Sequence, residues 1–402
     1  VDIPLSNEGL STLSADFFSK HLRRDRPLWE LVFVEQASKS APRKNQKGAA
    51  FALLIKVHHA ALDGVSAEAV IAGLLDMSVT PRVLPADEWQ PETPPGQAEL
   101  LLRQLWLVPE WKMQGRNLLH TGRVLGWRFL KRTVSRDERT LPYYFTAPRT
   151  IFNAPINSER LYCTAELSLS RIKSLKNQLP GVTVNDVVLG ICAGAVRRYL
   201  SDDGAMPTRS LVAMAPISKR NVDQKGASGN MVSSMLIRLA TDIDNPLERL
   251  KKIHDNARCA KEYNREMAIE SMLDYLPHAA SAHFLSRYKK SNAARLVPPM
   301  FNMVVTNVPG SPVPMYLDGA KMRGFTGMAG IYDGMALTLV VLSYCDTLTI
   351  SITSSPEVLQ DPERLAGYMT EALDELEQAV NQTAASSELI TANSLSGIQV
   401  GA

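Results

Sequence analysis

The chain has 402 residues, of which 45% are apolar and 21% charged, so it has the composition of a globular protein large enough for two or three domains. Its 44 basic and 41 acidic side chains leave a net charge of +3, which argues against nucleic acid as a partner. Four well-separated cysteines without a CxxC pair favour reduced thiols over a zinc site or disulfides, and no apolar run reaches the ~18 residues of a membrane-spanning helix.

Two strands are predicted near the amino end of the chain. Leu28–Glu35 and Ala49–Val57 are rich in aromatic and branched residues. The intervening segment Gln36–Gly48 carries basic residues and no acid, which predicts a solvated loop or, as the alternative, contact with an anionic ligand. A short helix is predicted over Ser66–Met77. The dense prolines of Ser78–Pro95 predict an irregular connector.

Residues 96–159 are predicted to form a helical connector between two halves of the chain. Glu99–Arg136 has helical periodicity, which Pro109 should break or kink. Eight basic residues and three tryptophans in this segment are typical of a helix that lies on a membrane surface. A pair of helices covering the core with exposed cations would have the same composition, so both interpretations stay open.

The second half, expected over residues 160–380, mixes strands and helices. The alternation of apolar residues predicts strands over 161–167, 211–217, 231–239, 301–308, 336–343 and 348–353. Helices are predicted over 168–179, 184–200 with Thr183 as its cap, 245–264 with Asn245-Pro246 at its start, 267–285 and 361–380. The small polar residues 381–402 predict a disordered tail.

The most informative segment is His58-His59-Ala60-Ala61-Leu62-Asp63-Gly64, which directly follows the second predicted strand. Successive side chains of a strand point to opposite faces, so only one of the two histidines can face a given cavity. An imidazole can be neutral, and therefore basic, at physiological pH. Asp63 adds a carboxylate, and Gly64 lacks a Cβ, so the backbone can turn and leave room for a substrate.

This HHxxxDG pattern is the signature of acyltransferases related to chloramphenicol acetyltransferase. Five further segments, in order, resemble motifs of the bacterial wax ester synthase/acyl-CoA:diacylglycerol acyltransferase family. They are Arg26–Glu30 (its PLW motif), Thr183–Leu189 (ND), Ala215–Arg220 (P-x-S-x-R), Thr306–Gly310 (SNVPG, with Thr for Ser) and Leu337–Leu339 with Ser343-Tyr344 (its last sheet segment). The resemblance extends from about Arg24 to Val380.

The resemblance implies an α/β fold with mixed sheets, in which two chloramphenicol-acetyltransferase-like halves enclose an active site in a tunnel between them. The first half, residues 1–95, carries HHxxxDG, and the second covers residues 160–380. Members of the family usually have a longer segment before the PLW motif, with an early strand and an L-D-x-x-F-like stretch. Only Val1–Asp25 precede the motif here, so we expect the first half to lack that segment.

The resemblance also implies a reaction, in which a long-chain acyl group moves from acyl-CoA to a fatty alcohol or a diacylglycerol without metal or prosthetic group. His59 would be the general base that takes the hydroxyl proton, and His58 would shape the strand end. Asp63 would be structural, with Arg220 as its candidate partner. The expected setting is the bacterial cytoplasm, at the inner membrane or on lipid inclusions, and a homodimer is compatible with it.

Two other motifs have a structural and a functional interpretation each. Asn185 and Asp186 can cap a helix, or they can support the catalytic loop or polarise the substrate carbonyl. Asn307 and Gly310 can form a turn at a strand end, or they can act in catalysis. The PLW residues Pro27-Leu28-Trp29 are expected to pack one wall of the first half.

Rival chemistries have weaker support in the sequence. Gly190-Ile191-Cys192-Ala193-Gly194 matches GxCxG, but it lies inside an apolar helical pattern, so helix packing is expected for Cys192 instead of a nucleophilic role. Adjacent histidines on a strand diverge, so no metal site is expected. Two rival functions remain: an acyltransferase of the same superfamily with another acceptor, and a catalytically silent protein that binds lipid inclusions.

Overall fold

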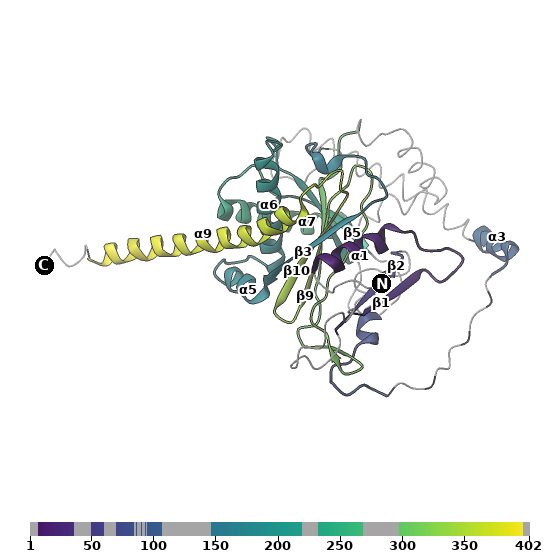
Figure 1. The fold of residues 1–402 in the computed structure, drawn as a ribbon. Coiled ribbons are helices and arrows are strands. Elements are labelled where there is room, and N and C mark those ends of the chain that lie inside the picture. Colours follow the sequence, from purple (N-terminus) through teal and green to yellow (C-terminus); the bar gives the residue numbers. More distant parts are fainter. Residues whose placement is uncertain are drawn as a thin grey trace.

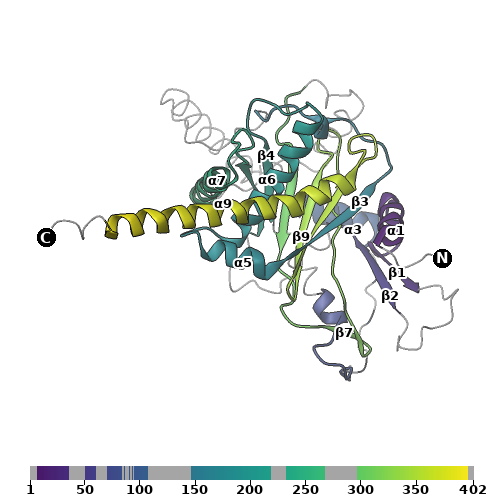
Figure 2. The ribbon, with the colours of Figure 1, turned by 60° about the vertical axis from the view of Figure 1, so that its left-hand side comes forward.

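The computed structural model of the protein describes residues 7–35, 50–59, 70–83, 86, 90, 93, 95–106, 146–218, 232–267 and 297–396. In this part of the chain, a two-stranded sheet near the amino end lies beside a larger six-stranded sheet (Figure 1). Helices cover one face of the larger sheet (Figure 2). The predicted class, α/β with mixed sheets, is confirmed.

A helix and a hairpin form the amino-terminal unit. The helix is α1 (Asn7–Ser19), and the hairpin joins β1 (Trp29–Glu35) to β2 (Phe51–Val57). The strands are antiparallel, with Trp29 opposite Val57. Helix α1 also contacts β3 (Leu161–Ser168), the edge strand of the larger sheet, so the unit lies along that edge.

A buried lysine joins the hairpin to the end of α1. The Lys56 Nζ lies 2.9 Å from Glu30 Oε2, and it donates to the carbonyl oxygens of Phe17 (2.9 Å) and Lys20 (3.1 Å). Its side chain is buried, and a buried ammonium group is strongly unfavourable unless its charge and its donors are paired. These contacts therefore fix which face of the hairpin meets α1.

The opposite face of the hairpin is open and apolar. Trp29 is 58% exposed, and Leu31 and Phe33 on the same strand are also exposed. The Phe33 ring stacks on Phe51 of β2, with centroids 4.8 Å apart. The prediction that the PLW residues pack a wall is therefore wrong for Trp29, because alternate residues of β1 point away from α1.

The six-stranded sheet has the order β3-β10-β9-β6-β4-β5. Its further strands are β4 (Val212–Ser218), β5 (Val232–Arg238), β6 (Met303–Val308), β9 (Thr338–Tyr344) and β10 (Thr347–Ser354). The pairs of β6 with β4 and with β9 are parallel, and the other pairs are antiparallel. The sheet is therefore mixed. The predicted strands agree with it to within one or two residues.

Four helices pack on this sheet. They are α5 (Leu169–Asn177), α6 (Val184–Asp202), α7 (Pro246–Met267) and α9 (Pro362–Ser396). Helix α6 contacts both α7 and α9, and two glycines allow the close approach. A Cβ on Gly190 would lie 3.1 Å from the Leu250 side chain, and one on Gly194 would lie 3.0 Å from Ala372.

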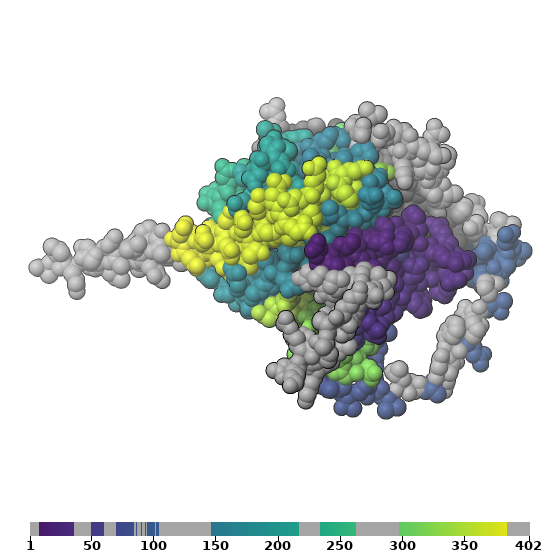
Figure 3. Space-filling model, viewed as in Figure 1, coloured from purple at the N-terminus to yellow at the C-terminus, as the bar shows by residue number. Residues whose placement is uncertain are grey.

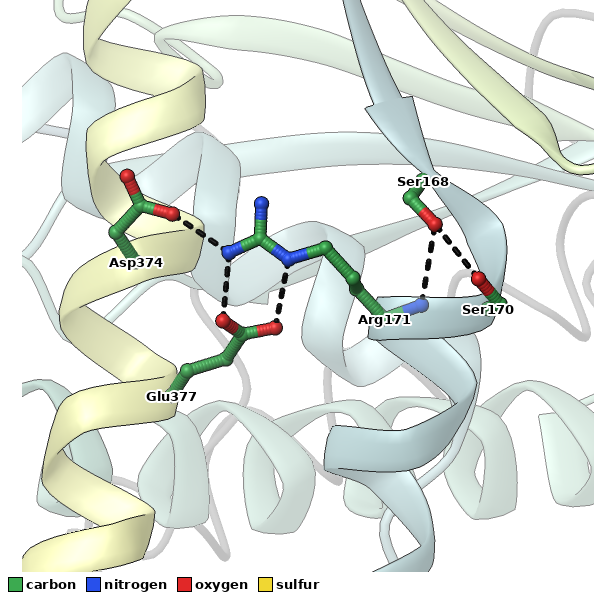
Figure 4. Close-up of polar contacts among 5 residues, drawn as sticks. All are labelled: Ser168, Ser170, Arg171, Asp374 and Glu377. Carbon is green, nitrogen blue, oxygen red and sulfur yellow. Dashed lines mark hydrogen bonds and ion pairs between the residues drawn. The ribbon is translucent and has the colours of Figure 1, made fainter.

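Arg171 ties α5 to α9 on the outer surface (Figure 4). Its guanidinium donates to both carboxylate oxygens of Glu377 (3.0 and 2.6 Å) and to Asp374 (2.6 Å). These acids raise the pKa of Arg171 above its ordinary value. The Ser168 hydroxyl accepts a hydrogen bond from the Arg171 backbone N–H and caps α5. Arg171 therefore takes part in the helix cap through its backbone and in the ion pairs to α9 through its side chain.

An arm of the second half reaches back to the segment that follows the histidine pair. It contains β7 (Tyr316–Leu317) and β8 (Ala320–Lys321). The backbones of Asp76 and Tyr316 exchange two hydrogen bonds of 2.8 Å. Around this bridge, the buried side chains of Leu75, Met315 and Tyr344 pack together. The two halves are therefore linked by backbone pairing as well as by apolar contact.

Two predicted boundaries differ from the structure. Helix α9 continues to Ser396, whereas the sequence predicts a disordered tail from Asn381. Of the predicted helical connector 96–159, the described residues 146–159 pack on the second core: Phe152, in the 3-10 turn Ile151–Asn153, is fully buried. The Asn153 amide donates to the carbonyls of Phe301 and Gly334 across that core.

Several predicted elements lie wholly or partly outside the described residues. They are the loop 36–48, the helix 267–285 and most of the helical segment 99–136, of which α3 (Gln97–Trp106) is described. The helix predicted over Ser66–Met77 is described from residue 70. It is helical through Leu74, and it is followed by the bridge residue Asp76.

A larger residue at Gly194 should destabilise the protein. Gly194→Val puts a branched side chain where α6 meets α9, and we expect a loss of about 1–3 kcal/mol in the free energy of unfolding, because overpacked cores strain their neighbours. Gly367→Val is the matched control, since nothing lies within 4 Å of a Cβ there. Equal melting temperatures of the two variants in thermal denaturation would contradict this packing.

Candidate active site

The histidine pair stands at the exit of β2. The His58 backbone N–H donates to the Leu28 carbonyl oxygen (3.0 Å), so the PLW segment is the direct neighbour of the pair. Both His58 and His59 are exposed. Strand β2 ends at Val57, so the pair follows the last strand residue and both side chains are accessible to solvent.

Three of the predicted site residues lie outside the described residues. They are Asp63, Gly64 and Arg220. The predicted contact between Asp63 and Arg220 therefore stays a prediction.

The structure brings Asn185 and Asn307 together. Asn185 lies in the first turn of α6, and Asn307 lies near the end of β6, 122 residues later. Asn307 Nδ2 donates to Asn185 Oδ1 at 3.5 Å, a long hydrogen bond, and Asn307 is exposed. An amide nitrogen carries two N–H groups, so this bond uses one of the two donors of Asn307. The pair can thus present amide donors to a carbonyl oxygen.

Asp186 is buried and has a capping role. Its Oδ2 accepts from the Thr183 backbone N–H and hydroxyl, both at 2.8 Å, while Thr183 Oγ1 accepts from the Asp186 N–H at 3.2 Å. This reciprocal arrangement is a capping box, which confirms Thr183 as the predicted cap. The structural interpretation of Asp186 is therefore confirmed, although its neighbour Asn185 points to a different partner.

His254 is a partner of Asp186 that the sequence did not reveal. Its Nδ1 lies 2.9 Å from Asp186 Oδ2. The sequence predicts a helix from Asn245-Pro246 that includes His254, but no motif marks this residue. The contact depends on how α7 crosses α6, which only the folded chain determines.

A glycine is required at position 310, where the chain leaves β6 and passes close to β9. A Cβ at this position would overlap the Ser343 carbonyl oxygen. The Gly310 N–H also donates to the Ser343 hydroxyl (3.2 Å). The glycine of the NVPG segment therefore allows two backbones to meet three residues after Asn307.

Cys192 is fully buried in α6, and burial raises its pKa to about 12. A thiol that stays protonated and out of contact with solvent is a poor nucleophile. Together with the contacts of Gly190 and Gly194, this supports the packing interpretation of the GxCxG segment.

The described residues hold neither a metal cluster nor a membrane-spanning helix. No group of three His, Cys, Asp or Glu side chains among them has the geometry to hold a metal ion. Within the same residues, no helix combines the length and the apolar character needed to cross a bilayer.

Comparison with known proteins gives consistent matches along the chain. Residues 2–188 match the wax ester synthase/diacylglycerol acyltransferase catalytic domain, and residues 228–377 match the WS/DGAT C-terminal domain. A Mycobacterium bovis protein named as a diacylglycerol O-acyltransferase is 33% identical over 92% of this chain and 78% of its own length. The O-acyltransferase WSD of Acinetobacter baylyi is 29% identical over 89% of this chain and 75% of its own length.

A solved structure agrees with these matches. The wax ester synthase/diacylglycerol acyltransferase from Marinobacter aquaeolei superposes with a TM-score of 0.63 at 26% identity, covering 94% of this chain and 79% of that one.

Substitution of Gly310 tests the close contact at the end of β6. We expect Gly310→Ala to lower the free energy of unfolding by about 1–3 kcal/mol, because the methyl group must displace the Ser343 backbone. Gly324→Ala adds the same methyl group in open space and should stay within about 0.5 kcal/mol of the native protein. If chemical denaturation gave both variants native stability, the contact with Ser343 would not exist in solution.

Proposed function

Because the chain belongs to the wax ester synthase/diacylglycerol acyltransferase family and is therefore an acyltransferase, we propose that it moves a long-chain acyl group from acyl-CoA to the hydroxyl of a fatty alcohol or a diacylglycerol. The products are a wax ester or a triacylglycerol, together with free CoA. The observation that carries the proposal is the exposed histidine pair at the end of β2, which lies within the segment that matches the family's catalytic domain.

In the proposed step, His59 accepts the proton of the acceptor hydroxyl while the oxygen attacks the thioester carbon. A C–O bond forms, the C–S bond breaks, and the proton passes from His59 to the departing thiolate. The step needs no acyl-enzyme, metal or prosthetic group. General base catalysis typically contributes about 10²- to 10⁴-fold, so positioning and stabilisation of the oxyanion must supply the rest.

The amide pair of Asn185 and Asn307 is the proposed source of that stabilisation. Asn307, near the carboxyl end of β6, is exposed, and Asn185, in the first turn of α6, is half-buried beside it. Donors fixed before the reaction stabilise the negative charge that develops on the carbonyl oxygen, without having to reorganise. The reaction centre would then lie in a tunnel between the two halves, with the base supplied by one half and the amides by the other.

Replacement of His59 tests the general base. We expect His59→Ala to lower kcat by about 10²- to 10⁴-fold, measured as CoA release from palmitoyl-CoA with hexadecanol or a diacylglycerol as acceptor. His21→Ala makes the same change at an exposed histidine of the amino-terminal unit, and it should leave the rate unchanged. Native turnover by His59→Ala would rule out this base.

The same assay separates the rival functions. Turnover with amines or short alcohols in place of long-chain alcohols would indicate an acyltransferase with a different acceptor. Binding to lipid droplets without CoA release by the native chain would indicate a silent coat protein.

The segment 99–136 is the proposed contact with the inner membrane or the inclusion surface. Its described beginning, α3, lies at the margin of the molecule in Figure 1, and Leu100 and Leu102 are exposed on it. Exposed leucines close to basic residues and tryptophans suit an interfacial helix. This contact would bring the enzyme to its poorly soluble acceptors.

Vesicle binding tests this membrane contact. Replacing Arg123, Arg128, Lys131 and Arg132 by Gln should weaken binding to anionic vesicles, since a basic side chain near an anionic surface contributes about 1 kcal/mol. A control variant with Gln at four exposed lysines of α5 and α7 carries the same change of net charge; these are Lys173, Lys251, Lys252 and Lys261. Equal binding of both variants in a sedimentation assay would exclude the segment as the anchor.

A further inference from the structure

His254 and Asp186 form a coupled pair at the start of α6. Asp186 is 2% exposed, and its Oδ2 accepts three hydrogen bonds: two from Thr183 and one from His254. A buried carboxylate is strongly unfavourable unless it is well paired. Thr183 provides the capping donors from within the same turn, whereas His254 provides its donor from another helix, so the pair locks α6 to α7.

The imidazole has a defined orientation. Asp186 Oδ2 already accepts both hydrogen bonds from Thr183, so we assign the ring proton that faces it to Nδ1. The Nε2 edge lies against Gly181, where a Cβ would be 3.7 Å from it. Gly181 has a φ of +80°, a conformation that glycine adopts without strain. The ring therefore packs beside the turn that precedes α6, while Asp186 holds its Nδ1 edge.

The first turn of α6 also carries Asn185. Asp186 is held by His254, and the adjacent Asn185 accepts the hydrogen bond from Asn307. Because that bond is 3.5 Å long, a small shift of the helix start would break it. The end of β6 is fixed separately, through Gly310 and Ser343. The position of α6 thus decides whether the two amides meet.

We propose that His254 is a positioning residue for acyl transfer, which acts through Asp186 to hold Asn185 against Asn307 where both amides face the thioester carbonyl. This proposal rests on the proposed function. His254 touches no substrate in it. Its role is to keep the donors of the amide pair in place before the reaction, because small displacements of catalytic groups reduce rates steeply.

The test compares two variants in the chain of 402 residues. His254→Leu removes the donor at similar volume, and His254→Asn keeps an N–H donor near the position of Nδ1. We expect kcat of His254→Leu to fall by roughly 10- to 100-fold with little change in KM, and His254→Asn to recover most of that loss. Lys251→Leu makes a leucine substitution at an exposed position of the same helix and should keep native kcat.

A double-mutant cycle tests the route of the effect. If His254 acts through Asn185, His254→Leu should cause no further loss of kcat in an Asn185→Ala background. Equal losses with and without Asn185 would overturn the proposal, as would a kcat of His254→Leu within about twofold of native. If His254→Leu fails to fold, kcat is compared between His254→Asn and His254→Gln instead. The longer Gln side chain cannot place its donor at the Nδ1 position without moving the helix, so its kcat should be lower. Equal kcat values for these two variants would overturn the proposal.

A measurement without turnover separates this proposal from the proposed function. In spectra of the protein labelled with ¹⁵N-asparagine, the side-chain amide signals of Asn185 and Asn307 should shift in His254→Leu and stay near their native positions in His254→Asn. Unshifted signals in His254→Leu would overturn the positioning role even if the native chain were active. A native chain that releases no CoA but shows these shifts would refute the proposed reaction and leave the structural link standing.

Discussion

The buried carboxylate of Asp186 holds the first turn of α6 in place, and the arrangement of the second half depends on that turn. Thr183 donates two hydrogen bonds to this carboxylate from the same turn, and His254 of α7 contributes a third. Helix α6 in turn packs against α9 through Gly194. A helix held at its start by polar contacts and along its length by close packing gives Asn185 a defined position. That position allows Asn185 to accept the hydrogen bond from Asn307.

The arm after β6 connects this site to the histidine half. The backbone of Tyr316 in this arm pairs with that of Asp76, which follows the histidines in the chain. The Tyr344 hydroxyl holds the arm in place: it accepts a hydrogen bond from the Met315 N–H and donates one to the Met322 carbonyl, each at 3.0 Å. The arm begins directly after Gly310. Asn307 therefore lies on the same continuous segment as Tyr316, which pairs with Asp76 of the other half. The histidine pair and the two asparagines are thus parts of one connected framework.

Much of this arrangement could be predicted from the sequence. Apolar alternation gave the strands, Thr183 marked the start of α6, and the ordered motifs indicated the acyltransferase family. The pairing of His254 with Asp186 could not be predicted, since it depends on the crossing of two helices. The burial of Lys56 and the exposure of Trp29 depend on which face of the hairpin meets α1. Local pattern shows that a strand has two faces, but tertiary contacts decide which of them is covered.

The four thiols differ in their access to chemical reagents. Burial raises the pKa of Cys163 and of Cys192 to about 12, so both stay protonated and unreactive at neutral pH. Cys259 on α7 and Cys345 at the base of the arm are free and half-buried. A maleimide label would therefore attach preferentially to these two. The native chain thus carries its own pair of attachment points for measuring, by energy transfer or electron resonance, the distance between Cys345 and Cys259 on α7.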